Sequence, residues 1–195
     1  MGGGSNAFIG FVPWIIFWVV ASPSTWEWAA LAALIAAVVL AAPSVSTPGG
    51  VKLLDAGTIA FFALVCLLAL FLDRADLDWL EKNAQVISSG ALALIAFVSL
   101  GFTPFTEQYA RDSAPREMWS TSRFRVLNRQ LTLMWGVVFA LTAVSGAIAL
   151  NVDAGHDFFE WILPVILIVG AFKLQMWLVA QARSRGRSPA AARPG

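Results

Sequence analysis

The sequence predicts an all-α, polytopic membrane protein with six transmembrane helices and both termini in the cytoplasm. The first observation is composition: the 195 residues are 58% hydrophobic and 13% charged, whereas soluble domains are about one-quarter charged. The second is that the apolar residues fall into six separate runs. The third is an alternation of charge between successive loops. With a mean hydropathy of +0.73, most of the chain is expected to be solvated by lipid.

Composition also excludes several functions. The net charge of +1 gives a nucleic-acid partner no electrostatic support. One cysteine, Cys66, and one histidine, His156, offer neither a disulfide framework nor a thiolate or histidine metal cluster. His156, Asp157 and Glu160 could lie close together, but acidic residues at a helix N-terminus are the preferred interpretation, since zinc needs three or four ligands. Without a recognisable catalytic motif, we expect no enzyme, no cofactor and no metal.

The apolar runs set the domain limits. Residues 1–7 are a Gly/Ser-rich tail, residues 8–180 are the six-helix domain, and residues 181–195 are a basic, disordered tail. The first run is short, at about 21 Å for a hydrocarbon core of about 30 Å. The six expected helices occupy residues 8–21, 26–42, 53–72, 86–102, 131–150 and 158–180.

Two spacings predict how the first helices lie. Trp14 and Trp18 are four residues apart, and we interpret them as an interfacial aromatic anchor. In the second helix, small residues recur every four positions and predict close approach of a neighbouring helix. These residues are Ala29, Ala33, Ala37 and Ala41.

Loop charges predict the orientation. One side receives mostly cations, namely Lys52, Arg111, Arg116, Arg123, Arg125, Arg129, Arg183, Arg185, Arg187 and Arg193. The other side receives mostly acids, namely Glu27, Asp73, Asp76, Asp78, Glu81, Asp153, Asp157 and Glu160, with Arg74 and Lys82 as its only cations. The positive-inside rule places the first side in the cytoplasm. We therefore expect a multi-pass protein of the bacterial inner membrane with both termini inside.

A polar segment over residues 104–130 interrupts the apolar pattern before the fifth helix. Its arginines alternate with aromatic residues, which is typical of an amphipathic start to a helix at the headgroups. One interpretation is topological: the arginines hold the loop inside. The other is a docking surface for anionic lipid headgroups or a protein partner, because arginine pairs in a fork with phosphate or carboxylate.

Lys173 is a single charge within the sixth apolar run. Snorkelling, or a salt bridge to Asp55 or Glu107, is preferred over a contact with an anionic ligand. The predicted partner- or lipid-binding residues are Tyr109, Arg111, Arg116, Trp119, Arg123, Phe124, Arg125, Asn128, Arg129, Trp135 and Lys173.

Several of these residues carry a family resemblance. Trp119, residues 123–128, Trp135 and Phe139 resemble the W-x-x-(basic)-L-N-x-x-W-x-x-F pattern of the bacterial intracellular septation protein A family. Residues 78–82 (DWLEK) are similar to that family's short loop before its fourth span. The resemblance implies a small inner-membrane protein of the cell envelope or division machinery, acting through protein contacts and without catalysis.

Two functions follow from these patterns. The first is a non-enzymatic scaffold associated with the envelope or septation, whose arginine and aromatic segment binds anionic lipid or a membrane or division protein. The alternative is a small oligomeric transporter or channel-like protein, with Lys173, Asn128 and the helices of Pro13 and Pro164 along its path. A homo-oligomer is compatible with both.

Overall fold

The computed structural model describes residues 5–20, 25–46 and 49–186. Within these ranges the chain is helical and has no strand. The elements are α1 (Ser5–Val20), α2 (Trp26–Val45), α3 (Leu53–Phe71), α4 (Arg74–Lys82), α5 (Ala84–Ser99), α6 (Phe105–Arg111), α7 (Arg116–Trp119), α8 (Ser122–Ala149), the π-helical turn η1 (Phe158–Ile162) and α9 (Leu163–Gly186).

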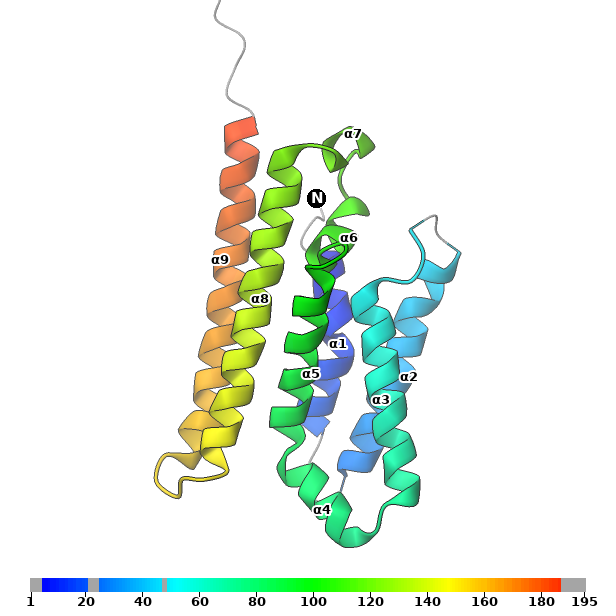
Figure 1. Cartoon of the computed structure of the whole chain (residues 1–195), viewed down its shortest axis with the longest axis vertical. Coiled ribbons are helices and arrows are strands. Elements are labelled where there is room, and N and C mark those ends of the chain that lie inside the picture. Colours follow the sequence, from blue (N-terminus) through cyan, green and yellow to red (C-terminus); the bar gives the residue numbers. More distant parts are fainter. Residues whose placement is uncertain (1–4, 21–24, 47–48, 187–195) are drawn as a thin grey trace, which may run out of the picture.

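The long helices form an antiparallel bundle (Figure 1). Helices α1, α2, α3, α5, α8 and α9 follow its long axis and alternate in direction, so that α1 begins and α9 ends at the same end. Helices α6 and α7 lie at that end, which we call the arginine end. Helix α4 and the loop between α8 and η1 lie at the other, which we call the acidic end.

The prediction of six membrane spans is wrong on the criterion of helix length. Among the described residues, four helices are long and apolar enough to cross a membrane: Trp26–Val45, Leu53–Phe71, Ser122–Ala149 and Phe158–Ala182. These four make the chain a multi-pass membrane protein by length and composition. Helices α1 and α5 have 16 residues each, or about 24 Å, which is less than a typical hydrocarbon core. Both pack against neighbouring helices of the bundle, α1 against α2 and α3, and α5 against α8 and α3.

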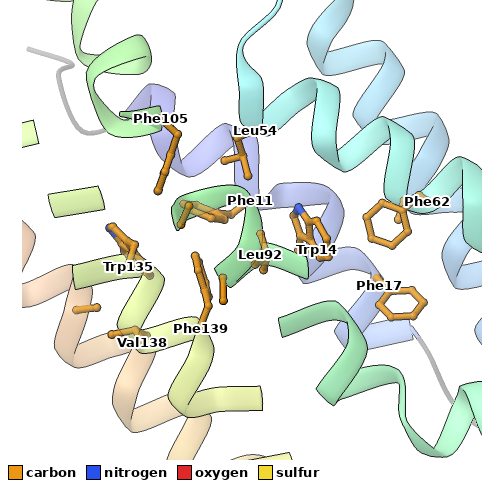
Figure 2. Packing of buried hydrophobic residues seen from close by; sticks show 14 of the residues in the cluster. Phe11, Trp14, Phe17, Leu54, Phe62, Leu92, Phe105, Trp135, Val138 and Phe139 are labelled. Atoms are coloured by element: carbon orange, nitrogen blue, oxygen red, sulfur yellow. The ribbon is translucent and has the colours of Figure 1, made fainter. Parts of the chain in front are cut away.

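Helix α1 supplies the centre of the core. The Phe11 ring lies 6.0 Å from the Phe105 ring, 5.3 Å from that of Trp135 and 5.5 Å from that of Phe139. Figure 2 shows these rings converging from α1, α6 and α8. A short helix is therefore held by aromatic packing from helices on both sides of it.

The interpretation of Trp14 as an interfacial anchor is wrong. Trp14 is fully buried, its ring lies 5.0 Å from Phe62, and its indole N–H donates to Thr58 at 2.9 Å. Trp18, one turn on, is half-buried and donates to the Ser88 hydroxyl at 3.0 Å. These tryptophans face protein because each indole N–H finds an acceptor on α3 or α5.

The small-residue prediction for α2 is confirmed, since all four alanines are buried and α2 packs against α1 and α3. The helix faces that point away from the core of the bundle are apolar and exposed, as lipid contact requires. Exposed side chains include Ile35 and Val39 on α2, Leu64 on α3, and Val165 and Val169 on α9.

The two tails differ from expectation where they are described. Helix α1 begins at Ser5, inside the expected N-terminal tail, and α9 continues to Gly186, past the expected end at residue 180. Residues 1–4 and 187–195, including Arg187 and Arg193, lie outside the described residues.

Candidate lipid- or partner-binding surface at the arginine end

Helix α6 is fastened to the start of α3. The Gln108 side chain accepts a hydrogen bond from the Leu53 backbone N–H at 2.7 Å and donates to the Thr103 carbonyl at 2.7 Å. The first N–H groups of a helix lack partners within it. Gln108 therefore satisfies one of these groups on α3 and joins two segments that are 55 residues apart.

A charged group surrounds Tyr109 beside this contact. The Tyr109 hydroxyl donates to the Asp55 carboxylate, and Lys52 Nζ pairs with Asp112 at 2.9 Å while lying 4.9 Å from the Tyr109 ring centre. Burial, and then the negative charge of Asp55, raise the pKa of Tyr109 far above its ordinary value. The Tyr109 hydroxyl therefore stays protonated at neutral pH, and its hydrogen bond to Asp55 holds α6 against α3.

An ion pair between a buried glutamate and a half-buried arginine stabilises α6 from its inner side. Glu107 is buried and accepts from Arg111 Nη2 at 2.6 Å, one helical turn away. The Arg111 guanidinium also lies 5.3 Å from the Trp119 ring centre. Arg111 therefore joins α6 to α7, and Glu107 is occupied by it rather than by Lys173.

Helix α6 also packs against α8 through hydroxyl groups. The Thr106 hydroxyl lies 2.7 Å from the Asn128 carbonyl and 2.7 Å from the Thr132 hydroxyl. The Asn128 side-chain amide donates to the Phe124 carbonyl at 2.9 Å. All three polar side chains are buried, and these bonds fix the height of α6 along α8.

Trp119 supports the outer arginines. Its indole N–H donates to the Ala114 carbonyl at 3.0 Å, and its ring lies 5.8 Å from the Arg116 guanidinium. Arg125 Nε donates to the Trp119 carbonyl at 3.4 Å. The short helix α7 thus positions one arginine at its own start, Arg116, and one after its end, Arg125.

Among the side chains that the structure describes, four arginines are exposed at this end, and we call them the arginine surface. They are Arg116, Arg123, Arg125 and Arg129. Within the described part of the chain, none of the four forms an ion pair with a carboxylate. Arg129 donates to the Leu100 carbonyl at 3.3 Å. Their guanidinium groups therefore remain available to anions outside the chain.

The predicted binding residues separate into three groups. The arginine surface faces outward, as expected for contact residues. Tyr109, Asn128 and Trp135 are buried, and Trp135 donates to Gln175 on α9 at 2.6 Å, so these three serve packing. The third group is half-buried and consists of Arg111, Trp119 and Phe124.

Lys173 lies apart from all of them, exposed on α9. Of the two expectations for Lys173, snorkelling or a salt bridge to Asp55 or Glu107, the salt bridge is not formed, since both carboxylates are engaged by groups of α6. Lys173 lies two residues from Gln175, hence near the level of Trp135, and about 9 Å deeper than Arg129. Its exposed position fits a side chain that snorkels along the outside of the bundle.

The contacts that hold α6 were not predicted from the sequence, although all of their residues stand in the loops and helix ends that it indicates. Lys52, Asp55, Gln108 and Asp112 come from two segments more than 50 residues apart. The available signal was that charge alternation placed both segments at the same membrane side. It did not pair individual side chains.

No family model, curated protein or solved structure matches the chain. The resemblance to the septation protein family therefore stays a prediction, and the function is inferred from the geometry of the chain itself.

Proposed function

We propose that this chain is a non-enzymatic multi-pass membrane protein whose arginine surface binds anionic lipid headgroups of the cytoplasmic leaflet. The observation that carries the proposal is the set of four exposed arginines without carboxylate partners in the described chain. Each arginine near an anionic leaflet contributes about 1 kcal/mol. The positive-inside rule supplies the orientation.

The internal ion pairs favour a binding surface over a loop whose arginines only hold it on the cytoplasmic side. Glu107 and Asp112 neutralise Arg111 and Lys52, so the cations of the fastened layer are already compensated. Among the described residues of this end, the cations without a carboxylate partner lie on the outside, and Trp119 contacts two of them, Arg116 and Arg125. A fixed arrangement of guanidinium groups favours forked hydrogen bonds to phosphate over diffuse attraction. A scaffold at the envelope, which the septation resemblance implies, would use the same surface.

The test is retention of lipid by the full-length protein. Purified protein in nanodiscs that contain phosphatidylglycerol and phosphatidylcholine would be transferred to a neutral detergent, and bound lipids identified by native mass spectrometry. We expect selective retention of phosphatidylglycerol. Changing Arg116, Arg123 and Arg125 together to glutamine should weaken this binding by about 3 kcal/mol, on the order of 100-fold.

The matched control is Arg74→Gln, which removes an exposed arginine at the acidic end, 3.8 Å from Glu27. It should leave phosphatidylglycerol retention unchanged. Equal retention by the triple variant and the wild-type protein, both folded, would overturn the lipid proposal. If the triple variant instead loses a co-purifying protein while its lipids stay bound, the surface is a protein interface and the lipid proposal is likewise rejected.

A further inference from the structure

A cavity of 390 Å³ lies at the acidic end, remote from the arginine surface. Residues of α1, α2, α4, α5, α8, η1 and α9 line it. Its walls are mostly apolar, with Phe17 from α1, Ala149 from α8 and Ile168 from α9 among them. Ligand pockets of about 300–1,000 Å³ are usual, with largely apolar walls and a few placed polar groups.

One of its polar groups has no partner among the described residues. Ser89 lines the cavity, is 0% exposed, and its hydroxyl makes no hydrogen bond to the part of the chain that the structure describes. Its neighbour Ser88 is equally buried but bonds to Trp18. A buried unpaired hydroxyl costs free energy, and in native proteins it requires an explanation. A ligand group that bonds to Ser89 is such an explanation.

The cavity wall also contains the π-helical turn. Glu160 and Trp161 belong to η1 and line the cavity. Two carbonyls of the turn accept side-chain bonds, from Ser145 to Phe159 at 2.5 Å and from Gln85 to Glu160 at 3.0 Å. Such turns occur mainly as single interruptions of α-helices, frequently at functional sites. Here the turn is pinned to α8 and α5, so its two cavity residues are held in place.

Aromatic and acidic side chains meet around the cavity. Three tryptophans line it, namely Trp18, Trp26 and Trp161. Glu81 and Glu160 line it as well, against one lysine, Lys82, which is exposed. His156 Nδ1 lies 3.2 Å from Glu160 Oε2. Aromatic rings combined with carboxylates are the usual surroundings of a bound ammonium group.

Glu81 lies beside a second acid, Asp78, as well as beside Lys82. Partial burial, and then the neighbouring Asp78, raise the pKa of Glu81, against the opposing effect of Lys82. The nearby lysine therefore does not fully compensate this carboxylate. Asp157 forms a close group with His156 and Glu160, but its side chain is 94% exposed and it does not line the cavity.

We infer that the cavity binds an apolar molecule with an ammonium headgroup, its apolar part between α1, α8 and α9 and its headgroup near Glu81 and Glu160. The Ser89 hydroxyl donates to an oxygen of the ligand or accepts from its headgroup. The molecule is either a membrane lipid with an amine headgroup or a soluble lipophilic amine. This site is independent of the arginine surface, because the two lie at opposite ends of the bundle.

The probe is decylammonium, whose headgroup can donate a hydrogen bond to Ser89, titrated onto the full-length protein in neutral maltoside detergent and counted by native mass spectrometry. We expect one saturable equivalent, bound at least tenfold more tightly than decanol, which has the same chain but no charge. Glu81→Gln combined with Glu160→Gln should weaken probe binding at least tenfold, and Ser89→Ala roughly fivefold. Lysophosphatidylethanolamine serves as competitor: displacement identifies a lipid as the source, and failure to displace identifies a soluble amine.

The control is Glu117→Gln, which removes an exposed carboxylate at the arginine end and should not change probe binding. Thermal unfolding midpoints show whether each variant is folded. If the double variant does not fold, Ser89→Ala and the decanol comparison still decide. Absence of saturable binding, equal binding of decanol, or unchanged binding by the folded double variant would overturn the inference.

Discussion

Two adjacent serines on α5 should respond in opposite ways to the same substitution. Ser88 and Ser89 are both 0% exposed. The Ser88 hydroxyl accepts from the Trp18 indole at 3.0 Å and donates to the Gln85 carbonyl at 3.3 Å, whereas the Ser89 hydroxyl has no partner within residues 5–20, 25–46 and 49–186. Replacement by alanine therefore removes a hydrogen-bonded hydroxyl at Ser88 and a hydroxyl without a partner in the described chain at Ser89.

The magnitudes follow from what is left unpaired. Ser88→Ala leaves the Trp18 N–H without its acceptor, which costs about 1–3 kcal/mol in water-soluble proteins and about 0.6 kcal/mol, at most about 1.7, within membrane bundles. We expect a loss of about 1 kcal/mol. Ser89→Ala removes an unsatisfied hydroxyl without opening a large space, so we expect a gain of about 1 kcal/mol in ligand-free protein. At about 2–4 °C per kcal/mol, the two variants should differ by about 4–8 °C.

The assay is thermal unfolding in a neutral maltoside detergent with a thiol-reactive dye. The single Cys66, half-buried in α3, becomes reactive as the bundle opens. Trp18→Phe should lower the midpoint on its own, and should add little to Ser88→Ala, because both remove the same bond. A lowered midpoint for Ser89→Ala, equal to that of Ser88→Ala, would show that the Ser89 hydroxyl is satisfied within the empty protein. It would remove the main argument for a ligand at that position.

Three further substitutions test the packing. Thr58→Val should destabilise the bundle by about 1 kcal/mol, because the buried Trp14 N–H loses its acceptor, and a double-mutant cycle with Trp14→Phe measures that bond. Gly10→Val should lower the unfolding midpoint by more than Thr58→Val does, since even a Cβ at Gly10 would lie 2.9 Å from Tyr109 Cζ. If these two glycine and threonine variants unfold like wild type, α1 is not held as described. Lys173→Leu should move the midpoint by less than about 2 °C, because the side chain is exposed; a larger loss would indicate a buried partner.

The helical architecture could be predicted because each apolar run had to become a helix in lipid. Backbone N–H and C=O groups cannot stay unpaired there, so run length and loop charge gave the order and direction of the helices. The same reasoning failed for α1. Its apolar run was assigned an interfacial aromatic face, yet Trp14 is the partner of Thr58 in the core. A tryptophan fits either place, and hydropathy does not record whether a distant helix offers an acceptor.

The residue types of the candidate surface could be predicted, but not which of its cations form internal ion pairs and which stay exposed. Nearly uniform arginines with interleaved aromatics indicated a surface, and four of the arginines are indeed exposed. Which cations are neutralised internally depends on contacts across more than 50 residues, such as Lys52 with Asp112. The cavity was harder still to predict from the sequence, because residues of seven elements line it. Its unpaired group among the described residues, Ser89, looks in sequence like a small residue for close packing.

The position of α1 connects the fold to the cavity. Trp18 lines the cavity and also bonds to Ser88, the residue next to the unpaired Ser89. Phe17, the preceding residue, lines the same space and packs 5.3 Å from Phe62 in the core. A ligand that fills the cavity therefore touches α1, one of the two apolar helices of the described chain that are shorter than a typical hydrocarbon core. Because anything that binds only the folded state stabilises it by mass action, occupancy of the cavity and retention of α1 in the bundle must favour one another.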